Sequence, residues 1–444
     1  LSRGLGDVYK RQSLTWGRQA SGWVSTISPA RFGSAMVRKP IACGTLSCRL
    51  RTVGPLTPGA RLKDRNSATS IDTLAVHAAR PGEAATGDVT PAIHVSTTYE
   101  RDVDGQYRRG YQYVRDGNPN RSAVENGVAA LEGAAAGVAF SSGSAATLAL
   151  FQVAARHGAI LATESSYHGT LRQLRELVPS MGGQVRLVDT TSLAAVERAM
   201  DERVALVFVE TPSNPLMGVS DIGELARIAG RCGAVLACDN TFATPVLQRP
   251  LDHGASMVLH SSTKYLGGHS DVMGGIVVGA EDDWMDEICH LRSAAGAAPS
   301  PFDCWLYQRS LPTLPLRVRR QSDSAVKIAE FLSTHPKVER VHYPGLASHP
   351  NHAVARSQMS GFGGMISFQL RAGLEQTMQT AARVVLFTRA TSLGGVESLI
   401  EHRASIEGPE TTTPNNLLRI SVGLESPDEL IGDLEQALGQ SPTG

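Results

Sequence analysis

The chain has 444 residues, of which 42% are hydrophobic and 19% are charged, and these values are typical of a globular protein with two or three domains. It has no uninterrupted apolar stretch of about 18 residues, so the sequence predicts no membrane span. The formal net charge is zero, which gives no reason to expect nucleic acid or a membrane as a partner. The six cysteines have no close metal-ligand spacing, so we expect free thiols and no metal site.

The net charge hides a strongly basic N-terminal segment. Residues 1–65 contain 12 Lys and Arg but only 2 Asp and Glu. Arg-rich, acid-poor N-termini resemble organelle transit peptides. Because the sequence begins at Leu1, a non-native extension is an equal alternative. We therefore expect residues 1–68 to be a basic extension without a defined fold. The expected location is the cytoplasm, or an organelle if this extension is a transit peptide.

The next 200 residues change from an irregular pattern to an alternating one. Residues 69–121 are rich in Gly, Tyr and Arg, which favours an arm or loop. From residue 122 to 280, helical patterns alternate with short, almost continuously apolar runs. This alternation predicts an α/β domain with a mainly parallel sheet and helices on both faces. The predicted helices are 122–135, 144–155, 171–178, 193–200 and 222–230, and the predicted strands are 138–140, 159–162, 184–188, 204–209 and 234–238.

A second region begins after Pro312 and Pro315. An amphipathic segment at 316–332 precedes strand candidates at 338–341, 364–370 and 417–422 and a helix at 428–438. This mixture predicts a smaller α+β C-terminal domain. The predicted domain bounds are 69–121 for the arm, 122–315 for the large domain and 316–444 for the C-terminal domain.

Two apolar runs of the large domain end in residues that can react. The run 234–238 is followed by Asp239, and the run that starts at Met257 closes with Lys264. An acid and a lysine at the ends of neighbouring strands can hold opposite sides of a flat cofactor. Pyridoxal phosphate needs such a pair, because a lysine amine forms its Schiff base and an aspartate partners its pyridine nitrogen. The alternatives are a capping role for Asp239 and a surface position for Lys264.

Small polar residues beside these runs indicate an anion site. The turn 141–144, Ser-Ser-Gly-Ser, lies between a strand and a helix, and the free N–H groups of a helix start can bind a phosphate. Ser261 and Thr263 can add hydroxyl donors to the same phosphate. A plain serine N-cap and a polar strand end are the alternatives.

An aromatic ring and a late arginine complete the pattern. Tyr167 follows the strand 159–162, where a ring can stack on a planar ligand or simply pack. Arg419 is a charge inside an apolar strand, which suits a substrate α-carboxylate or an internal salt bridge. The order of these features, rather than any single one, predicts an enzyme that uses pyridoxal phosphate.

At these residues the chain resembles the Cys/Met-metabolism family of pyridoxal-phosphate enzymes, also called the cystathionine γ-synthase family. The resemblance covers about residues 70–440. It implies the type I fold of pyridoxal-phosphate-dependent transferases. The motifs that carry it are 113–119 (Tyr-Val-Arg-Asp-Gly-Asn-Pro), 210–215 (Glu-Thr-Pro-Ser-Asn-Pro), 239–245, 260–269 and 392–400 (Ser-Leu-Gly-Gly-Val-Glu-Ser-Leu-Ile).

The resemblance implies a role for each matching position. Lys264 and Tyr167 would be catalytic, as the Schiff-base lysine and the stacking ring, and Asp239 would partner the pyridine nitrogen. Tyr113 and Arg115 would reach the cofactor of a neighbouring subunit, which implies a homodimer, usually within a homotetramer. The other residues implied to hold the cofactor are Gly143, Ser144, Ser261, Thr263, Thr241 and Asn214. The residues implied to bind the substrate are Arg419, Ser392, Asn214 and Thr391.

Four positions depart from the family pattern, and the last two bear on the substrate. Ser144 stands where Met is usual, and Val114 replaces a usual Ser. His168-Gly169 replaces Gly-Gly or Gly-Cys, which weakens the methionine γ-lyase interpretation. Thr391 stands where synthases and lyases often have Glu.

The resemblance implies a reaction at Cγ of a small amino acid. The substrate would be a homoserine derivative or cystathionine, and the outcome γ-replacement or γ-elimination. The alternatives are a cystathionine β-lyase and an O-acylhomoserine sulfhydrylase. A non-catalytic protein that binds the cofactor is disfavoured by the intact Lys264, Asp239 and Arg419.

Overall fold

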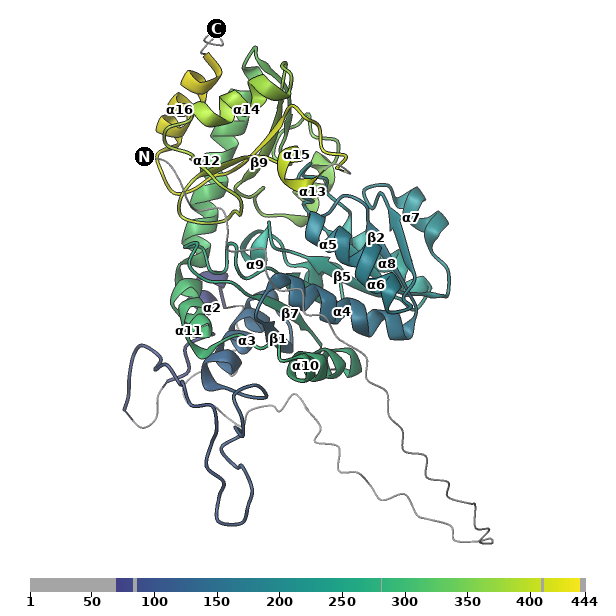
Figure 1. Ribbon diagram of the computed structural model, residues 1–444, viewed down its shortest axis with the longest axis vertical. Helices are drawn as coiled ribbons and strands as arrows, with labels where there is room; N and C mark the ends of the chain where they lie inside the picture. The colour runs from purple at the N-terminus through teal and green to yellow at the C-terminus, as the bar shows by residue number, and fades with distance from the viewer. Residues whose placement is uncertain (1–68, 83–85, 281, 409–410, 440–444) are drawn as a thin grey trace, which may run out of the picture. The chain divides into compact units, whose positions relative to one another are not determined.

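The computed structural model describes residues 69–82, 86–280, 282–408 and 411–439 (Figure 1). The basic extension predicted at 1–68 lies outside these residues. The described residues form two sheets with their helices.

The first sheet has seven strands in the order β1-β7-β6-β5-β4-β2-β3. Its central pairs, from β3 to β6, are all parallel. Strand β7 runs the other way, because it pairs antiparallel with both β1 and β6. The mainly parallel sheet is therefore confirmed. The strands are β1 Ala136–Phe140, β2 Ala159–Thr163, β3 Val185–Val188, β4 Val204–Glu210, β5 Val235–Asp239, β6 Met257–His260 and β7 Gly275–Gly279.

Strand β7 differs from the sequence prediction, which has no strand there. Its sequence, Gly-Ile-Val-Val-Gly, is a short apolar run between glycines, and all five of its residues are buried. Such a run has no periodicity that separates a strand from a buried helix segment.

Helices cover both faces of this sheet. Successive residues of a strand point to opposite faces, so Leu206 and Phe208 share one face and Val207 and Val209 the other. The first pair packs with α4 and α10, and the second packs with α7 and α8. The helices of this region are α3 Pro119–Glu132, α4 Gly143–His157, α5 His168–Arg172, the π-helix η1 Gln173–Leu177, α6 Val178–Ser180, α7 Leu193–Ala199, α8 Ile222–Arg231, α9 Thr244–Leu247, the 3-10 helix η2 Pro250–His253, α10 Asp283–Ala295, α11 Pro301–Ser310 and the 3-10 helix η3 Leu311–Thr313.

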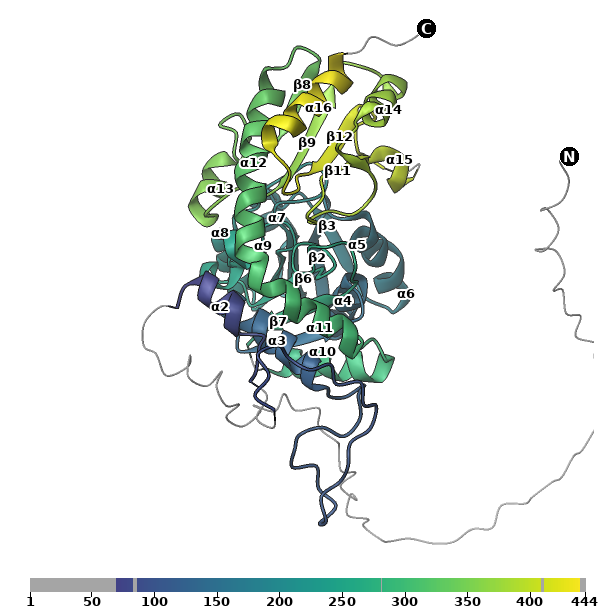
Figure 2. The same cartoon turned by 90° about the vertical axis from the view of Figure 1, so that its left-hand side faces the viewer.

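The second sheet has five strands in the order β10-β11-β12-β9-β8. Its pairs are antiparallel except β10 with β11. Helix α12 packs on β8 and β9 and also contacts α2 and α9, so it spans both sheet regions (Figure 2). The smaller α+β domain is confirmed. Its elements are α12 Leu314–Thr334, β8 Val338–His342, α13 His352–Gln358, β9 Met365–Leu370, α14 Leu374–Arg383, β10 Thr388–Arg389, β11 Leu399–His402, α15 Ala404–Glu407, β12 Leu417–Ser421 and α16 Pro427–Gly439.

The range 69–121 is not irregular throughout. Helix α2, Ile71–His77, begins after Ser70, whose side chain accepts a hydrogen bond from the Thr73 N–H. Ala75 and Ala79 are buried against α3, so this short helix belongs to the core. Beyond it, the chain forms long loops that extend away from α3 (Figure 2).

We expect Leu150→Ala to destabilise the large domain strongly. Leu150 in α4 is fully buried against the sheet, and removing a buried leucine side chain costs about 2–5 kcal/mol of unfolding free energy. Urea denaturation should therefore give a lower midpoint. Leu374→Ala is the matched control, because the Leu374 side chain is 48% exposed. Equal midpoints for the two variants would contradict the packing.

Candidate active site

A cavity of about 360 Å³ lies where the loops after β2, β4, β5 and β6 meet. The carboxyl ends of parallel strands share one edge of a sheet, and this edge is where open α/β sheets bind ligands. Residues from strand β12 and from the segments that connect the second sheet's strands close the cavity. Twelve of the sequence-predicted residues line it: Gly143, Ser144, Tyr167, Asn214, Asp239, Thr241, Ser261, Thr263, Lys264, Thr391, Ser392 and Arg419.

Tyr113 and Arg115 do not line this cavity. Both are exposed in the loops that precede α3, and the Arg115 guanidinium lies 5.2 Å from the centre of the Tyr113 ring. A contribution from these two residues to the cavity of the same chain is therefore not seen.

Lys264 lies in a turn and not at the end of a strand as predicted. Strand β6 ends at His260, and the Lys264 N–H then donates to the Ser261 carbonyl at 3.1 Å. This turn directs the side chain into the cavity, where Nζ donates to Ser392 Oγ at 2.8 Å. Burial, and secondly the Arg419 charge, lower the pKa of Lys264 to about 8. The Lys264 amine therefore loses its proton at a lower pH than an exposed lysine does, which suits a base or nucleophile.

Ser392 adopts a backbone conformation that few residues other than glycine use. Its φ is 80°, in the left-handed region, which costs about 1–2 kcal/mol for a residue with a side chain. The conformation has a visible effect, because Ser392 Oγ accepts from Lys264 while its carbonyl accepts from Arg419 Nη2 at 3.0 Å. Ser392 thus connects the amine of one sheet to the guanidinium of the other.

Arg419 is both buried and at the wall of the cavity. It lies on β12, and Nη2 donates to Glu401 Oε2 on the neighbouring strand at 2.9 Å. Nη1 donates to Asn214 Oδ1 at 3.0 Å. The internal salt bridge considered from the sequence is therefore present, and the guanidinium still faces the cavity.

Two carboxylates lie side by side at the ends of β4 and β5. Glu210 and Asp239 are direct partners in the parallel pairing. Glu210 accepts hydrogen bonds from Ser166 Oγ, the Tyr167 N–H and the Asn214 N–H at 2.7–2.8 Å. Burial and then the Asp239 charge raise the pKa of Glu210, and burial also raises the pKa of Asp239. Glu210 has no role in the sequence prediction, although it too is an acid that ends an apolar strand.

The start of α4 forms a narrow polar corner. Ser142 is the N-cap, and its side chain accepts from the Ala145 N–H at 3.1 Å. The first-turn N–H groups at Gly143 and Ser144 have no acceptor within the helix. A Cβ at Gly143 would lie 3.0 Å from Ser261 Oγ, so glycine lets the helix approach that hydroxyl.

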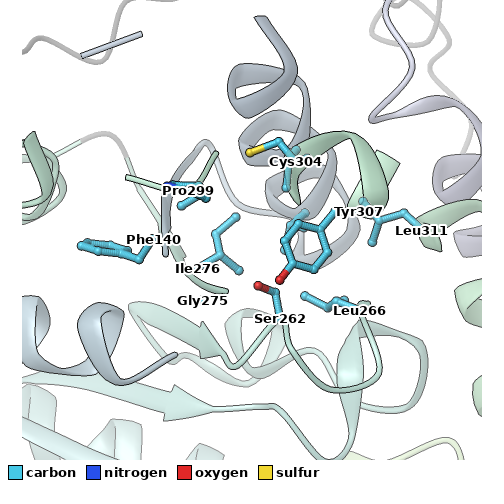
Figure 3. Close-up of a pocket in the computed structure, with 12 residues that line it drawn as sticks. Phe140, Ser262, Leu266, Gly275, Ile276, Pro299, Cys304, Tyr307 and Leu311 are labelled. Atoms are coloured by element: carbon cyan, nitrogen blue, oxygen red, sulfur yellow. The ribbon is translucent and has the colours of Figure 1, made fainter. Parts of the chain in front are cut away.

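The three hydroxyl residues after β6 face different spaces. Ser262 lines a second cavity of about 10 Å³, where its hydroxyl faces that of Tyr307 (Figure 3). Ser261 and Thr263 line the large cavity. The Thr263 hydroxyl also donates to the Gly274 carbonyl at 3.2 Å, so Ser261 is the freer donor.

These groups together define a class of protein. The corner at α4 can bind a phosphate, the carboxylate of Asp239 can hold a protonated ring nitrogen, and Lys264 can bond to an aldehyde. The donor set therefore fits pyridoxal phosphate, with Arg419 left for a substrate carboxylate. The fold and the cavity are those of an enzyme that holds a planar, phosphorylated cofactor and acts on an amino acid.

Comparison with known proteins identifies the family. Residues 72–439 match the family described as Cys/Met metabolism PLP-dependent enzyme. Cystathionine gamma-synthase of Mycobacterium tuberculosis is 45% identical over 373 residues, which are 83% of this chain and 96% of the relative. Cystathionine beta-lyase of Lactococcus lactis is 43% identical over 378 residues, 83% of this chain and 99% of the relative. The chain belongs to the Cys/Met-metabolism family of enzymes that depend on pyridoxal phosphate.

A solved structure supports the same assignment. The structure titled metB from Corynebacterium glutamicum superposes with a TM-score of 0.81 and 43% sequence identity, and the match covers 84% of this chain and 98% of that one. Among the described residues between 69 and 439, no helix is long and apolar enough to cross a membrane. The same residues include no group of three His, Cys, Asp or Glu side chains that could hold a metal ion.

We expect Lys264 of the cofactor-free protein to react with an amine-specific reagent at unusually low pH. Only the uncharged amine reacts, so labelling should rise with a midpoint near the Lys264 pKa of about 8. Mass spectrometry of peptides labelled between pH 6 and 11 measures this midpoint. The exposed Lys327 in the same digest reports the pH dependence of the reagent. A Lys264 midpoint above pH 10 would contradict the desolvated site.

We expect Glu210→Gln to destabilise the fold. Glutamine has one carbonyl oxygen, so its NH₂ group must face either the Asn214 N–H or the two donors from Ser166 and Tyr167. A buried donor without an acceptor costs about 1–3 kcal/mol of unfolding free energy. Urea denaturation of the cofactor-free protein measures this change as a lower midpoint. Glu197→Gln, at an exposed position of α7, is the control, and equal midpoints for the two variants would contradict the buried hydrogen bonds of Glu210.

Proposed function

We propose that this enzyme acts at Cγ of a homoserine-derived amino acid or cystathionine, by γ-replacement or γ-elimination. The observation that carries the proposal is the continuous contact from Lys264 through Ser392 to Arg419. A substrate carboxylate bound by Arg419 lies close to the Lys264 amine, which can move the substrate's protons.

The same proposal assigns the cofactor-binding residues. Bound pyridoxal phosphate supplies an electron sink for charge that develops on the substrate carbon atoms. Asp239 holds the pyridine nitrogen and Tyr167 covers the ring. The remaining contacts come from the corner at α4 and the polar residues around it, Gly143, Ser144, Thr241, Ser261, Thr263 and Asn214.

Lys264 performs the proton transfers. Its amine takes the proton from Cα of the substrate, would pass that proton on to the bound cofactor, and is then free to take a proton from Cβ, which allows the γ-substituent to leave. The low pKa suits this task, because an effective base titrates near the working pH. Arg419 holds the α-carboxylate through both reactions, and Ser392 keeps the amine directed at the cavity.

Tyr113 and Arg115 have a proposed role between subunits. They lie on exposed loops outside the cavity of their own chain, and Val89, Val95 and Val103 of the same loops are 73% exposed or more. Large exposed apolar residues indicate a surface that is covered in an assembly. We propose that these loops reach the cofactor of a second copy, in a homodimer within a homotetramer.

β-Elimination from cystathionine is the second candidate, since the L. lactis relative bears the name of a β-lyase. One product assay distinguishes the two. From cystathionine, reaction at Cγ yields 2-oxobutyrate, whereas reaction at Cβ yields pyruvate. With an O-acylhomoserine and cysteine, γ-replacement yields new cystathionine.

We expect Lys264→Ala to lose activity by a factor of at least about 10²–10⁴, since that is what a positioned acid or base contributes. The assay is formation of cystathionine or 2-oxobutyrate by the protein supplied with pyridoxal phosphate. Lys327→Ala, on the exposed face of α12, should retain wild-type rates. Normal turnover by Lys264→Ala, or pyruvate as the wild-type product from cystathionine, would refute the assignment.

A further inference from the structure

A group of buried charged side chains beside the cavity has no role in the proposed mechanism. Arg403 is at its centre, 3% exposed, and its side chain bridges two carboxylates. Nη1 donates to Glu401 Oε2 at 2.6 Å, while Nε and Nη2 donate to Glu407 Oε1 at 3.2 and 3.0 Å. Glu407 Oε2 in turn accepts from Thr411 and Thr413, each at 2.6 Å. The guanidinium is therefore held on two sides.

The fixed guanidinium determines the tautomer of a histidine. Arg403 Nη2 lies 3.5 Å from Nδ1 of His168. A guanidinium only donates hydrogen bonds, so Nδ1 must present its lone pair, and the ring proton is on Nε2. Burial and then the Arg403 charge lower the pKa of His168, against smaller opposing effects of Glu407 and Glu401. The imidazole is therefore neutral, with one N–H donor.

That donor belongs to the wall of the cavity. His168 lines the same cavity as Lys264 and Thr391, and its ring packs edge-on against Tyr167 with centres 4.5 Å apart. Among the described residues, none accepts a hydrogen bond from His168 Nε2. A free, neutral donor in a ligand cavity suits an uncharged oxygen, such as a carbonyl, better than a thioether sulfur, which accepts weakly.

We propose that His168 is a specificity-determining residue whose Nε2–H binds the acyl carbonyl oxygen of an O-acylhomoserine, and that Arg403 is the positioning residue that fixes its tautomer. This inference rests on the proposed function and deepens it, because it selects acyl esters among the γ-substituted substrates.

Two unreactive ligands isolate the contact. The amide of acetic acid with the γ-nitrogen of 2,4-diaminobutyrate keeps the acyl carbonyl, whereas O-ethylhomoserine has the same chain length without it. The dissociation constant of each is measured from the absorbance change of the holoenzyme. A neutral hydrogen bond contributes about 0.5–1.5 kcal/mol, so the wild type should bind the amide about 2- to 12-fold more tightly than the ether.

Matched variants at one position test which nitrogen is responsible. Glutamine places its NH₂ group near Nε2, whereas asparagine reaches only the Nδ1 position, where its carbonyl can still accept from Arg403. We expect His168→Gln to keep most of the preference for the amide. His168→Asn should bring the ratio of the two constants to about 1 by weakening the amide alone. Cofactor content and thermal unfolding midpoints of both variants check that the site is intact.

Three outcomes would overturn the proposal. An equal loss for both ligands in His168→Asn would mean a structural role, and an unchanged preference would place the carbonyl elsewhere. A third is ¹⁵N NMR of histidine-labelled protein that shows the His168 proton on Nδ1. The ratio of the two dissociation constants is measured without turnover. A wild-type protein that converts neither an O-acylhomoserine nor cystathionine would therefore refute the proposed function, and the binding test of His168 would remain valid.

Discussion

The buried guanidinium of Arg419 is the interaction on which the site depends. A charge taken out of water is tolerated only when it is paired, and breaking such a pair costs about 3–5 kcal/mol. Arg419 on β12 meets this requirement through Glu401 of its own sheet and Asn214 in the loop after β4. The Glu401 contact lies within the second sheet, whereas the Asn214 contact crosses to the loop after β4 and so favours the observed seating of the second sheet against the first. The same seating brings Ser392 to Lys264, so the electrostatic requirement and the assembly of the site coincide.

Most of the fold could be predicted from the sequence because its main signal is local. Strands buried on both faces are continuously apolar, and the helices between them are amphipathic, which predicts a parallel sheet without knowledge of distant contacts. Strand β7 was not predicted from the sequence, because a five-residue apolar run has no periodicity that identifies a strand. Helix α2 was not predicted either. It has only seven residues and is stabilised by packing on α3, which lies about 40 residues later in the chain.

In the site, too, local features could be predicted from the sequence and contacts between distant residues could not. Asp239 and Tyr167 follow apolar strands, and the end of a parallel strand is a position that the sequence reveals. Lys264 was found for the same reason, although the intervening turn and not the strand end directs its amine. The contact between Arg403 and His168 joins residues 235 positions apart, and no local sequence pattern predicts it. Arg419 is an intermediate example. Its position in an apolar strand predicted a buried charge, but the sequence did not decide between a substrate carboxylate and an internal salt bridge as its partner.

The paired carboxylates at the ends of β4 and β5 explain why a cationic ring belongs at this place. Two acids in register on adjacent strands repel each other, and burial raises the pKa of both. Glu210 has three hydrogen-bond donors around it, from Ser166, Tyr167 and Asn214, whereas the donors to the Asp239 carboxylate among the described residues come from Thr241. A positive charge would therefore stabilise the Asp239 carboxylate more than the Glu210 carboxylate. A protonated pyridine nitrogen beside Asp239 would supply that charge, so the register of the two strands would itself favour a cofactor with a cationic ring.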